Sequence, residues 1–105
     1  MMNRKSNEPM RLDLNNPVFQ RQLFNLPKND QRNILNTLRK LSKMTWSQVY
    51  TDHGLKWEAI LSREGPGDKK LYSFRIGKGF RGIAYREGLW LRILSLHPDH
   101  DSTYK

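Results

Sequence analysis

The sequence predicts an α+β fold in which N-terminal helices pack on a small twisted antiparallel β-sheet. In the first half of the chain, apolar residues recur along residues 34–41 at intervals of three and four, the spacing of an amphipathic helix. In the second half, residues 71–76, 80–86 and 89–96 have the composition of strands and are separated by turns that contain glycine. A chain of 105 residues has room for one compact domain.

The N-terminal segment, residues 1–9, is polar and ends in Pro9. This composition predicts a flexible arm with no structure of its own. We therefore assign residues 10–105 to a single domain. The domain begins with residues 11–14, whose alternating pattern predicts a short strand.

Two helices are expected after this strand. Pro17, which follows two asparagines, is typical of the first turn of a helix, here over residues 18–25. Pro27 ends this helix, and either Asn29 or Asp30 is expected to cap the second one. The apolar face of the second helix comprises Ile34, Leu35, Leu38 and Leu41.

The rest of the chain is predicted to be mainly β-structure. Residues 44–54 fit either a helical turn or a loop, whereas residues 56–61 fit a strand and residues 63–70 an exposed loop. The three strands of the second half then form a meander, with turns at residues 77–79 and 87–88.

The chain is strongly basic, with 19 Lys and Arg against 10 Asp and Glu and a formal net charge of +9. Such a surface attracts nucleic acid, an anionic membrane or an acidic protein. A membrane is the least favoured partner, because no segment approaches the ~18 consecutive apolar residues of a spanning helix and no signal-peptide pattern is present. The absence of cysteine excludes disulfides, thiolate catalysis and cysteine–zinc sites, and we expect a cytoplasmic protein.

Two arginines are predicted to face each other across the first hairpin. A three-residue loop at residues 77–79 places Arg75 directly opposite Arg81. Like charges in this position destabilise an antiparallel pair, but two converging guanidinium groups also form a fork-shaped site for phosphate. Lys78 at the turn would add to the positive field. The simpler interpretation is that these are ordinary exposed arginines on a solvated sheet face.

The next hairpin is predicted to add a cation and two aromatic rings to the same surface. With a turn at residues 87–88, Arg92 lies across from Ile83 and Trp90 pairs with Tyr85. Cations that bind phosphates, interleaved with rings on which bases stack, are what single-stranded RNA recognition needs. We therefore predict RNA-binding roles for these side chains, with partial burial of the strand as the alternative explanation.

The densest group of reactive side chains follows the last strand, which Pro98 ends. The group comprises His97, Asp99, His100, Asp101 and Tyr104. RNA cleavage by the 2′-hydroxyl needs a base, an acid and cations, and histidine and tyrosine can perform the proton transfers. We therefore expect no metal or cofactor. Three alternatives stay open: a structural histidine at a strand end, aspartates that act as caps, and a divalent metal site.

Residues 71–104 resemble the C-terminal half of the RelE/ParE superfamily of bacterial toxins. The matching residues are Arg75-Ile76-Gly77 at the end of one strand, Phe80-Arg81 through Tyr85 in the next, and the histidines that precede Tyr104. The resemblance implies an antiparallel sheet backed by N-terminal helices. In many members it also implies metal-independent cleavage of messenger RNA in the ribosomal decoding site.

The resemblance further implies roles for individual residues. Arg81 and Tyr104 would act on the phosphate and the nucleophile, while Arg75 and Lys56 would supply charge. The tail departs from the family pattern, because it has HPDHD where arginines are usual. This departure favours a histidine as acid or base and leaves open whether His97 or His100 has that role.

Three functions are therefore considered. The first is the toxin of a toxin–antitoxin system, an mRNA endoribonuclease that blocks translation at the ribosome, is neutralised by a cognate antitoxin protein and is a monomer when free. The second is a ParE-like toxin that inhibits DNA gyrase without nuclease activity. The third is a basic RNA-binding module without catalysis.

Overall fold

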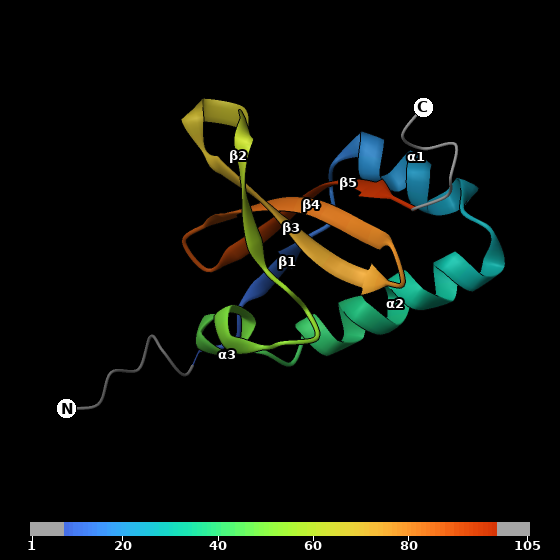
Figure 1. Cartoon of the computed structure of the whole chain (residues 1–105), viewed down its shortest axis with the longest axis horizontal. Coiled ribbons are helices and arrows are strands. Elements are labelled where there is room, and N and C mark those ends of the chain that lie inside the picture. The colour runs from blue at the N-terminus through green and yellow to red at the C-terminus, as the bar shows by residue number, and fades with distance from the viewer. Residues whose placement is uncertain (1–7, 99–105) are drawn as a thin grey trace.

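A computed structural model describes residues 8–98 of the chain, which form three α-helices and a five-stranded sheet (Figure 1). The predicted α+β class is confirmed. Residues 1–7, most of the expected N-terminal arm, lie outside the described residues, as do residues 99–105 of the tail. Within the described part, no helix has the length and apolar character needed to cross a membrane.

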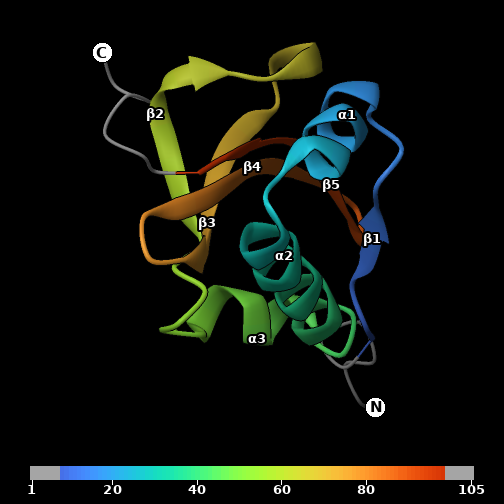
Figure 2. The same cartoon turned by 90° about the vertical axis from the view of Figure 1, so that its right-hand side faces the viewer.

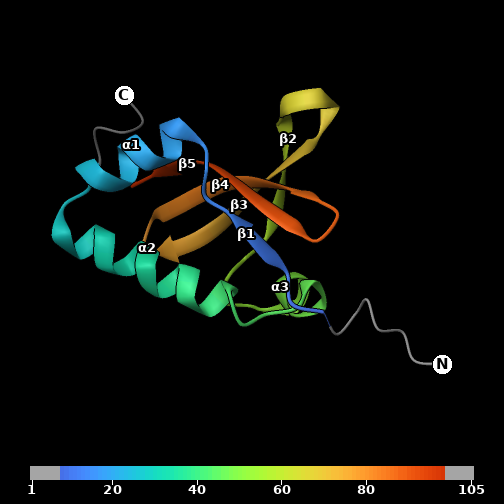
Figure 3. The ribbon, with the colours of Figure 1, turned by 180° about the vertical axis from the view of Figure 1, so that it is seen from behind.

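The sheet has the strand order β1-β5-β4-β3-β2. Its strands are β1 (Arg11–Asp13), β2 (Glu58–Glu64), β3 (Lys70–Gly77), β4 (Phe80–Glu87) and β5 (Trp90–His97). Strands β3 to β5 form the predicted antiparallel meander, and β2 pairs antiparallel with β3. The short N-terminal strand β1 joins the sheet in a parallel pairing with β5, which makes the sheet mixed (Figure 3). At the other edge, β2 extends away from the rest of the molecule (Figure 1).

The helices are α1 (Pro17–Asn25), α2 (Lys28–Leu41) and α3 (Trp46–Thr51). Helix α1 begins as predicted, because the Asn16 side chain accepts hydrogen bonds from the first-turn backbone at 2.8 and 3.2 Å. The predicted cap of α2 at Asn29 or Asp30 is wrong, since this helix begins at Lys28 without a side-chain cap. Residues 44–54, for which the sequence allowed either a helical turn or a loop, contain helix α3. Its start is fixed by a capping box of Thr45 and Gln48.

The hydrophobic core lies between the helices and one face of the sheet. Helix α1 packs on β5 and α2 packs on β3, so both cover the same side (Figure 2). The face of α2 that reaches the sheet carries Ile34, Thr37, Leu38 and Leu41. Leu35 was predicted on this face but is 56% exposed, because it projects beyond the edge of the contact. The opposite face of the sheet is not covered by a helix of the described residues.

Two turns and one strand start differ from their predictions. The first hairpin has a two-residue turn, Lys78-Gly79, in place of a loop at residues 77–79, and Gly79 has a φ of +70°. The second turn is Gly88-Leu89 in place of residues 87–88. Strand β2 begins two residues later than expected, since Lys56 has a left-handed backbone with a φ of +52°.

A glycine brings β4 close to the core where β4 carries the candidate site. A Cβ atom at Gly82 would lie 2.4 Å from the ring of Phe74, the residue opposite it on β3. Phe74 is almost completely buried, so its ring has no space into which it could move. Because Gly82 has only a hydrogen atom as its side chain, the two strands that carry Arg75 and Arg81 can pair over a filled core.

We expect Gly82→Ala to lower the free energy of unfolding by about 1–3 kcal/mol, because the added methyl group overpacks the core against Phe74. Gly54→Ala is the matched control, since a Cβ there meets its nearest atom at 3.4 Å, an ordinary contact. Urea unfolding of both variants measures the difference. Equal stability of the two variants would contradict the close approach of Phe74 to β4.

Candidate nucleic-acid interface

Three of the predicted site residues form a row across neighbouring strands on the open face of the sheet. Arg75 on β3 lies opposite Arg81 on β4, and Arg81 lies opposite His97 on β5. Both arginines are exposed, whereas the alternate residues Phe74 and Ile76 point into the core. The predicted pairing of Arg75 with Arg81 is confirmed, and the sheet adds His97 to the same line.

The pairing arises in a different way from the one predicted. Gly77 lies opposite Phe80, which shifts the expected register by one residue at the turn. A bulge between Arg75 and Gly77 shifts it back, so that Arg75 meets Arg81 after all. The predicted loop was one residue too long and the bulge at Ile76 was not predicted, and the effects of these two errors on the register cancel.

A pocket of about 130 Å³ opens beside the two arginines. Its polar lining comprises Lys56, Glu58, Ser73, Arg75 and Arg81, with Gly77 and Gly79 at the turn end. Three cations and one carboxylate thus surround a small space, a composition that suits an anion such as phosphate. Lys56, predicted to supply charge, lies at the pocket. Glu58 was not predicted, because nothing in the sequence showed that the start of β2 faces Ser73.

The cations of this surface have no partners within the described part of the chain. No hydrogen bond or ion pair joins the side chain of Arg63, Arg75 or Arg81 to another described residue. Opposed like charges without a counter-charge raise the energy of a sheet. A bound anion between the guanidinium groups would remove this cost.

His97 lies at the end of β5, where its ring is half-buried. Its Nε2 atom is 2.8 Å from the hydroxyl oxygen of Ser95. Burial, and then the positive charge of Arg63, lowers the pKa of His97 below its ordinary value of 6.5. The neutral imidazole is therefore favoured near pH 7 and can accept a proton. Arg63, which the sequence analysis placed in an exposed loop, contributes to the site through its charge.

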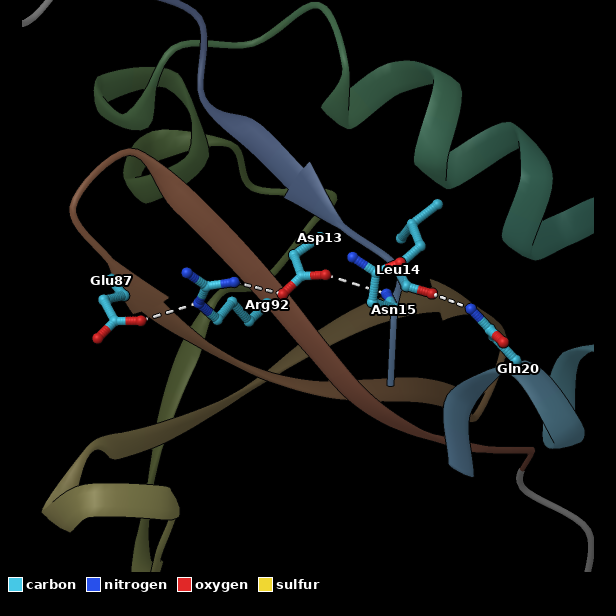
Figure 4. A network of polar contacts seen from close by, with 6 residues as sticks. All are labelled: Asp13, Leu14, Asn15, Gln20, Glu87 and Arg92. Atoms are coloured by element: carbon cyan, nitrogen blue, oxygen red, sulfur yellow. Dashed lines mark hydrogen bonds and ion pairs between the residues drawn. The ribbon is translucent and has the colours of Figure 1, made fainter. Parts of the chain in front are cut away.

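Arg92 has a structural partner on each side, in contrast to Arg75 and Arg81. Its guanidinium donates to the carboxylates of Asp13 on β1 and of Glu87, the latter at 2.9 Å (Figure 4). Burial alone would raise the pKa of Asp13, but hydrogen bonds from the Asn15 N–H and from Arg92 outweigh it and lower the pKa. The charge of Arg92 is thus used to attach the edge strand β1 to β5.

The predicted pairings around the second hairpin are wrong by two residues. Arg92 lies opposite Tyr85 and Trp90 opposite Glu87, because the turn is one residue later than expected. Trp90 is 37% exposed, and the Arg92 guanidinium lies 5.5 Å from the centre of its ring. Trp90, Arg92 and the half-buried Tyr85 therefore form a separate group toward the β1 edge. Lys78, at the first turn, is exposed beside the pocket.

The tail residues His100 and Tyr104, predicted to be catalytic, lie outside the described residues, as do Asp99 and Asp101. Within residues 8–98, no group of three or more His, Asp or Glu side chains lies close enough together to hold a metal ion.

The fold is similar to that of a chain in the crystal structure of the archaeal RelE–RelB complex from Pyrococcus horikoshii OT3. The two chains share 25% identity with a TM-score of 0.61, and the alignment covers 87% of this chain and 96% of that one. No protein-family model and no curated protein matches the sequence. The chain therefore has a RelE-like fold, which together with the motif residues of β3 and β4 supports a RelE-like toxin.

We expect Arg81→Gln to raise the free energy of unfolding by about 0.2–1 kcal/mol, because it removes the repulsion with Arg75 across the ladder. Inorganic phosphate should stabilise the unaltered protein more than this variant. Arg39→Gln, which removes an exposed charge from α2, is the control and should leave the response to phosphate unchanged. Urea unfolding at low ionic strength measures both effects. A destabilised Arg81→Gln with an unaltered phosphate response would contradict an anion site.

Proposed function

We propose that this RelE-like toxin is an endoribonuclease that cleaves messenger RNA, at the ribosome, and so blocks translation. The observation that carries the proposal is the row of Arg75, Arg81 and His97. It combines two unpartnered cations with a base that is neutral near pH 7. The RelE-like fold supports the same function.

The arrangement suits cleavage by the adjacent 2′-hydroxyl of RNA. A base takes the proton of that hydroxyl, whose oxygen attacks the phosphorus atom, and the bond to the 5′-oxygen breaks as an acid protonates it. The products are a 2′,3′-cyclic phosphate and a free 5′-hydroxyl. Arg75 and Arg81 would hold the phosphate and stabilise the extra negative charge that develops on its oxygens. Lys56 and Lys78 would add to the positive field.

We assign the role of base to His97, because it lies opposite Arg81 and its lowered pKa keeps the imidazole neutral. Glu58 in the pocket is the competing base. We propose His100 or Tyr104 as the acid, because imidazole and phenol groups can both donate a proton. No step in this scheme uses a metal.

A protein antitoxin is the partner that we propose for the free toxin. The structural neighbour is a RelE–RelB complex, and the open sheet face of this chain carries cations without partners in the described part. An antitoxin with an acidic segment would cover that face and neutralise part of the +9 net charge. We propose a cytoplasmic monomer that pairs with one such protein.

Controlled expression of the chain tests the nuclease function. We expect growth to stop and new messenger 5′ ends to appear in coding regions. Arg81→Gln should lower the cleavage rate about a hundredfold or more, the typical loss for a group that stabilises developing charge. Arg39→Gln should cleave normally, since it removes the same charge from the helix side.

Arrested growth without new 5′ ends would reject the nuclease function. If the purified chain then inhibited DNA supercoiling by gyrase, it would be a ParE-like toxin. Identical cleavage by the unaltered chain and by Arg81→Gln would also reject the proposed site.

The pH dependence of cleavage tests the assignment of His97. A base acts in its neutral form, so the rate should rise with pH to a plateau, and the midpoint of the rise should lie below pH 6.5 because the pKa of His97 is lowered. His97→Gln should remove this rise and slow cleavage by about 10²–10⁴-fold. Single-turnover rates in a ribosome-containing reaction provide the measurement. A rise that persists in His97→Gln and disappears in Glu58→Gln would assign the base to Glu58.

A further inference from the structure

A second pocket of about 460 Å³ adjoins the pocket beside Arg75 and Arg81, on the side of α3. Its lining includes the side chains Tyr50, His53 and Trp57. Lys56 and Glu58 line both pockets, so the two spaces share a wall. The two pockets are therefore adjacent, with Lys56 and Glu58 between them.

Tyr50 presents an exposed aromatic ring that is held in place. Tyr50 is 51% exposed. Its hydroxyl oxygen accepts a hydrogen bond from Arg86 at 2.9 Å, and its ring lies 5.6 Å from that of Trp46. The Arg86 guanidinium in turn stacks 4.4 Å from the Trp46 ring centre. A ring fixed in this way loses little conformational entropy when a ligand stacks on it.

Trp57 supplies a second, more rigid wall. Its indole ring stacks on Tyr72 with a centroid distance of 4.7 Å and meets Trp46 edge-on at 5.4 Å. Trp57 is half-buried, so it is anchored in the protein and still lines the pocket.

The loop between Tyr50 and Trp57 places Lys56 at both pockets. The Asp52 carboxylate accepts hydrogen bonds from the Leu55 N–H at 2.8 Å and from Lys40 at 3.1 Å. Lys56 then adopts its left-handed backbone, a conformation that is unfavourable for a residue other than glycine. Its side chain has no hydrogen bond or ion pair with any residue that the structure describes.

We propose that the pocket of Tyr50 and Trp57 binds a nucleobase of the single-stranded RNA whose phosphate is held by Arg75 and Arg81. The inference rests on the proposed function and adds a base-stacking subsite to it. Lys56 contacts the sugar–phosphate backbone between the two pockets. Exposed rings beside unpartnered cations are the combination that binds unstacked bases and their phosphates. Stacking of this kind favours no particular base, because every base has a π-face.

Binding of a labelled, 2′-O-methylated single-stranded oligoribonucleotide tests this subsite, since the methyl group blocks cleavage. Fluorescence anisotropy gives the Kd for the unaltered chain and for three variants. Tyr50→Ala removes the ring and should weaken binding about tenfold. Tyr50→Phe keeps the ring and should bind within about twofold of the unaltered chain. Phe24→Ala, which removes a ring that is 74% exposed on α1, is the matched control and should bind normally.

A second oligonucleotide, abasic at a single position that is varied along the strand, shows whether a base is involved. At one position, loss of the base should weaken binding to the unaltered chain. Tyr50→Ala should bind this abasic oligonucleotide as well as it binds the intact one. The inference is overturned if Tyr50→Ala binds like the unaltered chain, if the abasic penalty is the same in both, or if neither binds the oligonucleotide.

Cleavage of messenger RNA is scored in parallel to separate this inference from the nuclease function. Normal cleavage together with binding that ignores Tyr50 rejects the subsite alone. Binding that depends on Tyr50, without any cleavage, supports the subsite and rejects the nuclease.

Discussion

The antiparallel pairing of β3 with β4 forces two guanidinium groups to face each other on the open side of the sheet. A sheet selected for stability alone would not retain this pair, because the repulsion lowers the free energy of unfolding. Arg75 and Arg81 nevertheless lie over a well-filled core, in which the Phe74 ring fits against Gly82. Tight packing beneath them fixes the two strands that carry the charges. The row with His97 and the pocket beside the arginines depend on this pairing.

Two classes of cation are present in the described part of the chain. Arg92 and Arg86 stabilise the fold: Arg92 joins Asp13 and Glu87, and Arg86 lies over the Trp46 ring and donates to Tyr50. The cations at the centre of the open face have no such partners within residues 8–98. The net charge of the chain therefore overstates the number of cations that are available to an anionic partner, because part of that charge is used within the fold.

Hydrophobic periodicity was sufficient to predict the fold class, the meander and the approximate position of every strand, because burial sets these features. The details of pairing could not be predicted, since bulges and turn lengths depend on tertiary packing. At Arg75 two errors cancelled, whereas at Arg92 a turn predicted one residue too early gave the wrong partner. Glu58 and Tyr50 were missed because their importance comes from neighbours that are distant in the sequence.

Side-chain NMR of arginine during an RNA titration tests the central claim most directly, because each guanidinium Nε–H gives its own signal. With an uncleavable single-stranded RNA, the signals of Arg75 and Arg81 should shift together at the same RNA concentration, along with the imidazole of His97. The signal of Arg92 should stay nearly constant, since its hydrogen bonds are already made within the protein. Shifts confined to the helix side, at Arg32 and Arg39, with Arg75 and Arg81 unchanged, would contradict the account.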